Sequence, residues 1–399
     1  MESVEGSQLS ADGARLSDNF AVVSGVPAGN SGTGQLVAYL RSSGLRFIEP
    51  GRRLDRADDR TVVHELVFWM REGPRWLIFF FRLWILRNSG RGVLLLHPQD
   101  IGFNATLRII KLMRGNCWIY LLDSSFFCIR SYNFMPMETS ACLRCLADPS
   151  QYAAKKFGCA PFPRQTFSAM TFVRKLRALA RSGKVSFFAQ NQRQATLAEQ
   201  QFGVNVPVVG LWTAELERSL VLETTESSEP VRAETRWDVV FHGNDIPAKG
   251  SRWALSVAQH APGLSFLFPF KRPEDFKNQP DNCDFVEMCW TSGLKEAVSD
   301  CEVALSPSAW SAPIEGALIK NIRYASVTAV LKNETSFSDE IPNTVVLHLE
   351  NEPEKAAEQL VKAVSLKSTI EANPKVEWLE FFVEKNRAFI EKIKSEIRR

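Results

Sequence analysis

Residues Trp237–Gly250 read WDVVFHGNDIPAKG, and this stretch decides the fold of the second half of the chain. The apolar run VVF predicts a buried strand, and Gly243, just after it, is followed six residues later by Lys249. We expect a helix to start at Ser251. A strand, a glycine-containing loop and a helix N-terminus place backbone N–H groups and a lysine ammonium at one point, which favours phosphate. An ordinary strand–helix connection with a surface lysine fits the same residues.

The composition is that of a globular protein with more than one domain. Its 399 residues suffice for two or three domains and a sizeable core. The net charge of +3 is unevenly spread: residues 1–230 hold 27 Lys and Arg against 20 Asp and Glu, or +7, whereas 231–399 hold 21 against 25, or −4. A basic first half favours contact with anionic lipid or an anionic acceptor, although a bias of this size is also ordinary. Because no long basic run alternates with aromatic residues, nucleic-acid binding is not expected.

The N-terminal residues 1–19 are polar, and we expect them to form a disordered tail without a signal peptide. No apolar run reaches the ~18–20 residues that a membrane span needs. We therefore expect a cytoplasmic protein whose eight cysteines are thiols or metal ligands rather than disulfides.

A first domain is expected over 20–214. Apolar runs alternate there with helical patterns, which predicts a parallel sheet covered by helices. The strands are expected at 20–24, 93–96, 118–122, 185–189 and 206–209. A short helix through Leu40 is expected after the glycine-rich loop 25–35, and further helices are expected at 104–113, 172–181 and 195–202.

A second alternating series follows residues 215–235, which are polar without an apolar period and are typical of a linker. A second domain is expected over 236–375, followed by a C-terminal helix in 376–399. Its strands are expected at 239–241, 265–268, 303–306, 327–330 and 345–347, and its helices at 251–260, 294–298, 314–322 and 353–365. The predicted fold class is α/β, with two Rossmann-like domains facing a cleft in which ligands bind at the carboxyl ends of the strands.

A second loop favours a nucleotide in that cleft. Residues Ser306–Lys320 read SPSAWSAPIEGALIK, and Glu315 opens the helix that follows. A carboxylate in this position can accept hydrogen bonds from a ribose diol, and it is also favoured by the helix N-terminus without any ligand. The loop alone does not decide between these interpretations.

Together these segments resemble the second domain of GT-B glycosyltransferases, in particular the family-4-like group (glycosyltransferase group 1) that uses nucleotide sugars. The family's Gly-Arg-x(4)-Lys-Gly segment is similar to Gly243-Asn244-x(4)-Lys249-Gly250, with asparagine in place of arginine. The resemblance covers about residues 236–365 well and the first domain in outline.

The family's Pro-Ser-x-(Trp/Tyr) loop is similar to Pro307–Trp310, and its Glu-Ala helix is similar to Glu315–Ala317. The family has another glutamate eight residues earlier, and here Ser311 lies in that neighbourhood. The resemblance implies that Lys249 contacts the diphosphate and that Glu315 holds the ribose. The donor-binding residues that it implies in this domain are Gly243, Asn244, Lys249, Gly250, Ser308, Trp310 and Glu315.

In the first domain, the family's glycine-rich first loop is similar to Gly29, Gly32 and Gly34, which the resemblance adds to the donor-binding set. Glycines in such a loop let the backbone approach a ligand closely.

Three polar residues at predicted strand ends are the candidate catalytic residues. His97 follows the strand 93–96, Asp100 is close by, and Asp123 follows the next strand. The resemblance places His97 on the acceptor side, where it is a base or a hydrogen-bond donor to the sugar. A histidine satisfied by a nearby carbonyl fits equally, as does an Asp123 that caps the turn at 124–125.

Half of the cysteines fall in a predicted insertion at 124–165. Cys128, Cys142, Cys145 and Cys159 have the spacing C-x(13)-C-x(2)-C-x(13)-C. Four thiolates form a tetrahedral set for structural Zn²⁺, and a C-x(2)-C knuckle supplies two of them from one turn. Buried free thiols and an iron–sulfur cluster are the alternatives. The cysteines expected in the core are Cys117, Cys283, Cys289 and Cys301.

The most apolar segment is Arg75–Arg87, RWLIFFFRLWILR. A helix of this kind can lie in a membrane interface, with arginines at the headgroups and tryptophans at the boundary. It can also be buried between the sheet and its neighbours, with the arginine heads reaching solvent. The first interpretation fits a lipid-linked acceptor.

The sequence thus predicts a glycosyltransferase (hexosyltransferase-like, EC 2.4) that moves a sugar from a nucleotide-sugar donor to a glycan or lipid-linked glycan in surface polysaccharide synthesis, at the inner face of the membrane. A structural zinc is the expected metal. A catalytically inactive GT-B protein that binds a glycan or partners a transferase is the alternative, because the arginine and the earlier glutamate are missing. The sequence does not specify the sugar, the nucleotide, the acceptor, the stereochemistry or the oligomeric state.

Overall fold

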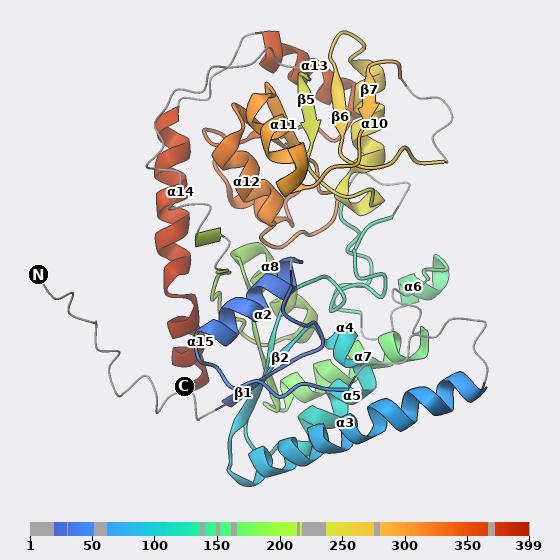
Figure 1. Cartoon of the computed structure of the whole chain (residues 1–399), viewed down its shortest axis with the longest axis vertical. Coiled ribbons are helices and arrows are strands. Elements are labelled where there is room, and N and C mark those ends of the chain that lie inside the picture. Colours follow the sequence, from blue (N-terminus) through green and yellow to red (C-terminus); the bar gives the residue numbers. More distant parts are fainter. Residues whose placement is uncertain are drawn as a thin grey trace, which may run out of the picture.

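In the computed structural model, two α/β domains lie one above the other, and the C-terminal helices run along one side of both (Figure 1). The structure describes residues 20–29, 31–51, 62–135, 140–148, 152–160, 166–213, 216–217, 237–274, 280–365 and 372–398. The predicted tail, 1–19, and nearly all of the predicted linker, 215–235, lie outside the described residues.

The first domain is built on a parallel sheet with the strand order β1-β2-β3-β4. These strands are β1 (Phe20–Ser24), β2 (Gly92–Leu96), β3 (Cys117–Tyr120) and β4 (Val185–Phe188). Every residue in them except Ser186 is buried, because helices cover both faces of the sheet. The predicted strand at 206–209 is reduced to a single bridge between Ala189 and Val208.

Alternate residues of β1 face two different layers of helices. Val23 packs in a core with α3 (Val62–Asn88), α5 (Phe103–Leu112), α7 (Thr166–Arg181) and α8 (Gln192–Phe202). Val22, on the other face, packs in a core with α2 (Gly32–Ser42). The short helix α4 (Pro98–Ile101) follows β2 directly, and α6 (Tyr152–Lys156) lies in the cysteine-rich insertion.

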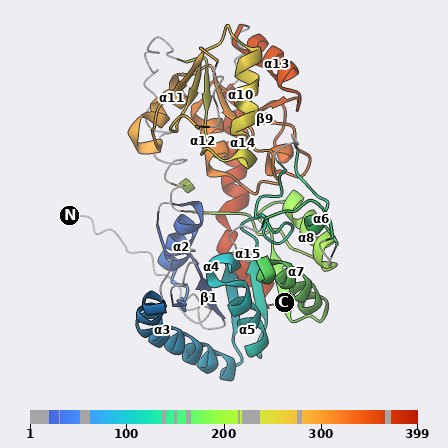
Figure 2. The same cartoon turned by 90° about the vertical axis from the view of Figure 1, so that its right-hand side faces the viewer.

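Helix α3 lies along the outer edge of the first domain (Figures 1 and 2). It is longer than the predicted segment and has Pro74 inside it. Phe79, Leu83 and Leu86 are buried against the domain, whereas the opposite face is exposed, so the alternative of a helix buried between the sheet and its neighbours does not hold. None of the helices in the described part of the chain is long and apolar enough to cross a membrane.

The second domain is built on a parallel sheet with the strand order β10-β9-β8-β5-β6-β7. Its strands are β5 (Val239–Phe241), β6 (Phe266–Phe268), β7 (Cys283–Phe285), β8 (Val303–Ser306), β9 (Val327–Leu331) and β10 (Leu347–Leu349). Strand β7 was not predicted. The strand order reverses between β5 and β8, and such a switch point opens a crevice at the carboxyl ends of the two strands.

The helical elements of the second domain follow the predicted alternation. They are η1 (Pro247–Lys249), α10 (Ser251–His260), η2 (Trp290–Leu294), α11 (Lys295–Asp300), α12 (Gly316–Tyr324), η3 (Phe337–Glu340) and α13 (Pro353–Ser365). The bounds of α10 and α13 agree with the prediction.

The predicted C-terminal helix is two helices, α14 (Ala372–Arg387) and α15 (Phe389–Arg398). Near the junction, the buried Asn386 side chain donates to the carbonyl of Phe382 (2.8 Å) and accepts from the N–H of Leu211 (2.9 Å). An asparagine that bonds to backbone in this way competes with the helix. Helix α14 lies on the second domain, and α15 returns to the first, where the Phe389 ring lies 5.6 Å from that of Tyr120.

Candidate functional site

A cavity of about 280 Å³ opens at the switch point of the second sheet. It lies between the loops that follow β5 and β8, and a third wall comes from the segment around η2. The residues that line it are His242, Gly243, Asn244, Lys249, Pro269, Met288, Cys289, Trp290, Leu294, Ser306, Ser308, Glu315 and Ala317. Five of the seven donor-binding residues implied in this domain therefore share one cavity.

Three of these residues form a connected polar group. Lys249 Nζ forms an ion pair with Glu315 Oε1, and Ser308 Oγ donates a 2.6 Å hydrogen bond to Glu315 Oε2. The Lys249 and Glu315 side chains are only 24% and 12% exposed, so solvent screens their attraction less than on an open surface. The pair presents a cation, and a carboxylate that can accept hydrogen bonds, to the same cavity.

The helix N-terminus at the cavity is that of α12, not that of α10. A 3₁₀ turn, Pro247–Lys249, separates the β5 loop from α10, and the first residue of α10, Ser251, does not line the cavity. Glu315 is the N-cap residue of α12, and Ala317 in its first turn lines the cavity. The partial positive charge of a helix N-terminus therefore acts beside Lys249, from a different helix than predicted.

Gly250 holds the two loops together without lining the cavity. Its φ is +81°, and a Cβ placed on it would lie 2.0 Å from the Pro307 carbonyl oxygen. The N–H of Ala309 also donates to the carbonyl of Ala248 (2.9 Å). Only glycine allows this approach of the β8 loop to the β5 loop.

Trp310 is buried behind the cavity rather than exposed in it. Its ring is 5.3 Å from Lys249 Nζ, a cation–π distance. On its other side it packs edge-to-face against Tyr132 of the cysteine-rich insertion, with 4.7 Å between ring centroids. Trp310 can therefore position Lys249, but it does not face a ligand in the cavity.

His242 is a cavity residue that our sequence reasoning did not single out. Burial lowers its pKa to about 4, so the imidazole is neutral near pH 7. Its Nδ1 lies 2.6 Å from Asn321 Oδ1, and its ring stacks on Trp290 at 5.2 Å. The sequence signal that could have identified His242 is its position between the buried strand 239–241 and Gly243.

Cys289 corrects a prediction, because it is exposed rather than part of the core. Hydrogen bonds from Ser292 and then Thr291 lower the pKa of its thiol to about 7. The other three cysteines expected in the core are buried. The Cys289 sulfur lies in a loop after β7, a strand absent from the prediction, so its exposure could not be anticipated.

The three candidate catalytic residues of the first domain come together. His97 Nδ1 lies 3.1 Å from Asp100 Oδ2, and His97 Nε2 lies 3.3 Å from Asp123 Oδ2. Burial by itself lowers the pKa of His97, but the contact with Asp100 and the charge of Asp123 outweigh it, so the pKa is raised. Asp123 Oδ1 also accepts from the N–H of Ser125 (2.8 Å), as in the turn-capping interpretation.

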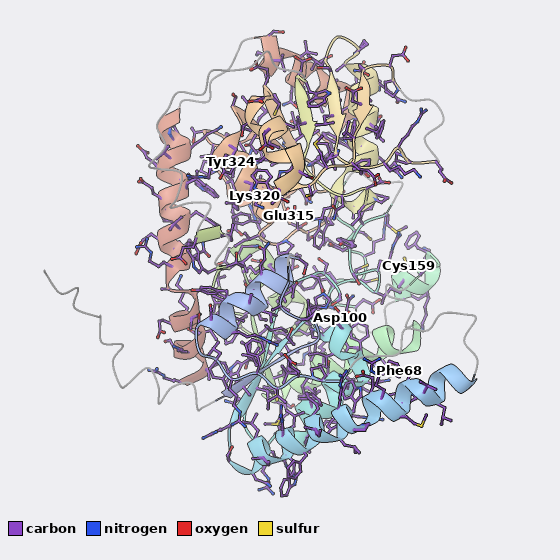
Figure 3. The ribbon with its side chains drawn as sticks, viewed as in Figure 1. Phe68, Asp100, Cys159, Glu315, Lys320 and Tyr324 are labelled. Atoms are coloured by element: carbon purple, nitrogen blue, oxygen red, sulfur yellow. The ribbon has the colours of Figure 1, made fainter. Side chains whose placement is uncertain are left out.

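The backbone of His97 is strained. Its φ of 54° and ψ of 67° lie in the left-handed region, which a non-glycine residue adopts only when its surroundings enforce it. Such strain clusters at functional sites. Figure 3 shows Asp100 in the first domain and Glu315 in the second, on the sides of the two domains that face each other.

The cysteine-rich insertion joins the two domains at the β8 loop. Asn133 Oδ1 accepts from the N–H of Ser311 (3.0 Å), and Asn133 Nδ2 donates to Ser311 Oγ (2.8 Å). Both side chains are buried. The insertion thus holds the loop that carries Ser308.

The glycine-rich loop of the first domain lies at the start of α2. Ser31 caps this helix by accepting from the N–H of Gly34 (3.1 Å), and Gly34 packs closely on Gly29. Gly29, Gly32 and Gly34 are not among the residues that line the switch-point cavity. The structure therefore does not bring them together with Lys249 in one cavity.

The four insertion cysteines line one small cavity of about 10 Å³. Burial raises the pKa of Cys128 to about 12, which disfavours a free thiolate there. Within the described residues, no group of three or more His, Cys, Asp or Glu side chains is arranged to hold a metal ion. The structure therefore gives no support to the predicted zinc.

Solved structures with a similar fold are GT-B glycosyltransferases. HepE of Anabaena in complex with UDP matches with a TM-score of 0.57 and 10% identity, over 94% of this chain and 100% of that one. Sucrose-phosphate synthase from Thermosynechococcus elongatus matches with a TM-score of 0.58 and 12% identity, over 95% and 98%. TarM matches with a TM-score of 0.50 and 12% identity, over 79% of this chain but only 57% of TarM. No family model and no curated protein matches the chain. The chain has the GT-B fold, as the sequence resemblance implied.

Proposed function

From the GT-B fold and the contents of its switch-point cavity, we propose that this protein is a glycosyltransferase. It moves a sugar, of the hexose class, from a nucleotide-sugar donor to a glycan or lipid-linked glycan acceptor in surface polysaccharide synthesis. The observation that carries the proposal is the convergence of Lys249, Glu315 and Ser308 in one cavity. We propose that Lys249 and the N-terminus of α12 bind the diphosphate, and that Glu315 accepts hydrogen bonds from the ribose.

The transfer breaks the bond between the anomeric carbon and the diphosphate oxygen, and it forms a bond from that carbon to an acceptor hydroxyl oxygen. The nucleoside diphosphate leaves with the bonding electrons, and the hydroxyl proton passes to a base. In our proposal, Lys249 stabilises the charge that develops on the leaving diphosphate. His97 takes the proton, and Asp100 and Asp123 orient its imidazole and stabilise its protonated form.

Two observations of the surface support a peripheral site of action at the inner face of the membrane. Helix α3 exposes a row of large apolar side chains, and Arg71, Arg75 and Arg82 lie among them. An apolar helix face with interspersed arginines suits the interface of an anionic membrane. We propose that this face places the protein next to a lipid-linked acceptor.

Donor binding tests the proposal directly. Thermal-shift measurements with UDP, GDP, ADP and CDP sugars should show stabilisation by one of them, and Lys249→Ala should remove it. UDP sugars come first in the panel, because the similar fold of HepE binds UDP. Lys332→Ala is the matched control, since Lys332 forms an exposed pair with Glu350. A shift that survives Lys249→Ala would contradict the proposed phosphate site, and donor binding without any transfer would favour the inactive alternative.

A further inference from the structure

A second, larger cavity of about 690 Å³ lies beside the candidate catalytic residues of the first domain. Its walls are the end of β1, the segment around Glu49–Gly51, and helix α3. Asp100 lines it, and Asp100 is the residue that contacts His97 Nδ1 at 3.1 Å. A molecule bound in this cavity therefore lies next to the carboxylate that contacts the proposed base.

Three arginines line this cavity, against two carboxylates, Glu49 and Asp100. Arg41 is paired with Glu49, and Arg75 is paired with the buried Glu72 (2.6 Å). Arg82 has no hydrogen bond or ion pair with any of the described residues. Among the described residues, the cavity therefore offers one guanidinium without an ionic partner and two paired guanidiniums in the same lining, a set of donors that suits phosphate oxygens.

The α3 wall of the same cavity continues into an apolar surface. Ile78 lines the cavity and is 53% exposed. The other large apolar side chains that the helix exposes are Leu66, Val67, Trp69, Met70, Leu77, Phe81, Trp84 and Ile85. An apolar face of this extent on a soluble domain marks a contact surface. A hydrocarbon chain that leaves the cavity would lie on this face, in contact with lipid.

The opposite wall is held firmly against the domain. The N–H of Ile48 donates to the carbonyl of Val22 in β1 (2.9 Å). A Cβ on Gly51 would lie 2.6 Å from the Trp76 ring of α3, so only glycine allows this contact. The segment 48–51 and helix α3 are therefore held in place on either side of the cavity.

We propose that this cavity binds the phosphate-bearing headgroup of a membrane-embedded acceptor. The phosphate lies on Arg82, with Arg41 and Arg75 beside it, and the hydrocarbon chain follows α3 into the bilayer. The sugar end of the acceptor then points past Asp100 toward His97. This inference rests on the proposed function and deepens it, because it specifies the acceptor as an alkyl or polyisoprenyl phosphate derivative.

The test uses the full chain and vesicles of phosphatidylcholine with or without hexadecyl phosphate, with bound protein measured by co-sedimentation. We expect hexadecyl phosphate to increase binding, and Arg82→Gln to weaken that binding on the order of tenfold, the usual effect of losing one charge-assisted contact. Arg387→Gln, on an exposed surface of α14 and outside the cavity lining, is the control and should bind as the unmodified protein does. Equal losses in both variants would show a nonspecific charge effect and overturn the proposal.

Competition experiments distinguish a lipid phosphate from free inorganic phosphate, and a second variant covers the case in which Arg82→Gln does not fold. Inorganic phosphate should compete weakly, and hexadecanol in the vesicles in place of hexadecyl phosphate, which has the chain but no anion, should not give the Arg82-dependent binding. Full competition by inorganic phosphate would overturn the lipid assignment. If Arg82→Gln does not fold, Arg41→Gln on the opposite wall takes its place, and unchanged binding by it would also overturn the proposal.

The thermal shift with donor distinguishes this inference from the proposed function. Arg82→Gln should keep the donor shift, because Arg82 does not line the donor cavity. A protein that binds no nucleotide sugar would contradict the proposed function. A protein that binds donor, but whose affinity for hexadecyl phosphate is the same with Arg82→Gln, would contradict this inference alone.

Discussion

His97 Nε2 lies 3.3 Å from Asp123 Oδ2, although the two residues follow different strands. Strands β2 and β3 are neighbours in a parallel sheet, so their carboxyl ends bring these side chains together. Asp100, one turn after His97, supplies the second carboxylate. A histidine between two carboxylates holds its proton to a higher pH than an isolated one.

Asp123→Asn should lower the pKa of His97, since it removes one of the charges that favour the imidazolium. NMR titration of the His97 imidazole measures this pKa. A base must be neutral, so the acid limb of the activity profile should move to lower pH in the variant. An unchanged His97 titration would show that Asp123 does not act on it.

The same pair should make folding stability depend on pH. The folded pKa of His97 is raised, so its contribution is fully present below the unfolded pKa of about 6.5 and is lost as the pH rises through the folded pKa. Urea denaturation at several pH values should show this loss in the unmodified protein and a smaller loss in Asp123→Asn. A larger loss of folding stability with rising pH in Asp123→Asn would contradict a raised pKa of His97 in the folded protein.

Glu315→Ala should weaken donor binding by about tenfold, because it removes the carboxylate proposed to hold the ribose. Isothermal titration with the preferred nucleotide sugar measures the affinity. Glu350→Ala is the control, because it also removes the partner of a lysine, but on an exposed surface 3.7 Å from Lys332. An affinity unchanged by Glu315→Ala would remove this residue from the site.

Gly250→Ala should destabilise the protein more than Gly44→Ala does. Both glycines have a φ near +80°, but a Cβ at Gly44 meets nothing within 4 Å, whereas at Gly250 it meets the Pro307 carbonyl. The strain of the left-handed conformation costs about 1–2 kcal/mol in each variant, and the collision adds to it only in Gly250→Ala. Equal free energies of unfolding would show that the β8 loop moves away freely.

Asn133→Ala should lower the free energy of unfolding by about 1–3 kcal/mol, because it leaves the buried N–H of Ser311 without its partner. It should also weaken donor binding, since Ser311 belongs to the loop that carries Ser308. Gln201 offers a comparison, because its buried amide also bonds the insertion, at the backbone of Phe126 and Ala147. If Asn133→Ala and Gln201→Ala affected donor affinity equally, the insertion would have no specific effect on the donor loop.

The cysteine spacing still predicts a structural zinc, and metal analysis of the purified chain tests it. If zinc binds, about one equivalent should be found, and Cys142→Ser should lower it and the thermal stability together. Cys289→Ser is the control, because Cys289 lies outside the insertion. Metal-free protein with ordinary stability would leave the four cysteines as free thiols.

Most of the fold could be predicted from sequence because buried parallel strands are short apolar runs. The run VVF and the helix after it have the expected bounds, 239–241 and Ser251–His260. Strand β7 was missed because its middle residue, Asp284, is polar and exposed. The division of the C-terminal helix was missed because it depends on a contact between Asn386 and Leu211, far apart in the chain.

Site residues could be predicted where a local strand–loop–helix pattern marks them. They could not be predicted where they depend on a contact with a residue far away in the sequence. Lys249 and Glu315 stand at the ends of recognisable strand–loop–helix units. The contact of Asn133 with Ser311 joins residues 178 positions apart, and no local pattern marks it. The cavity of about 690 Å³ combines Arg41 of α2 with Arg82 of α3, and only the packing of the two helices on one sheet brings these arginines into one lining.

The return of α15 to the first domain has a consequence for biosynthesis. Phe389, Ile390 and Ile393 share a core with Phe20 and Tyr120, so the first domain is assembled from both ends of the described chain. A ribosome makes all of the second domain before it supplies these three side chains. The first domain therefore cannot complete its core during translation until the second has emerged, and a nascent chain halted between the domains would expose an apolar sheet face to chaperones.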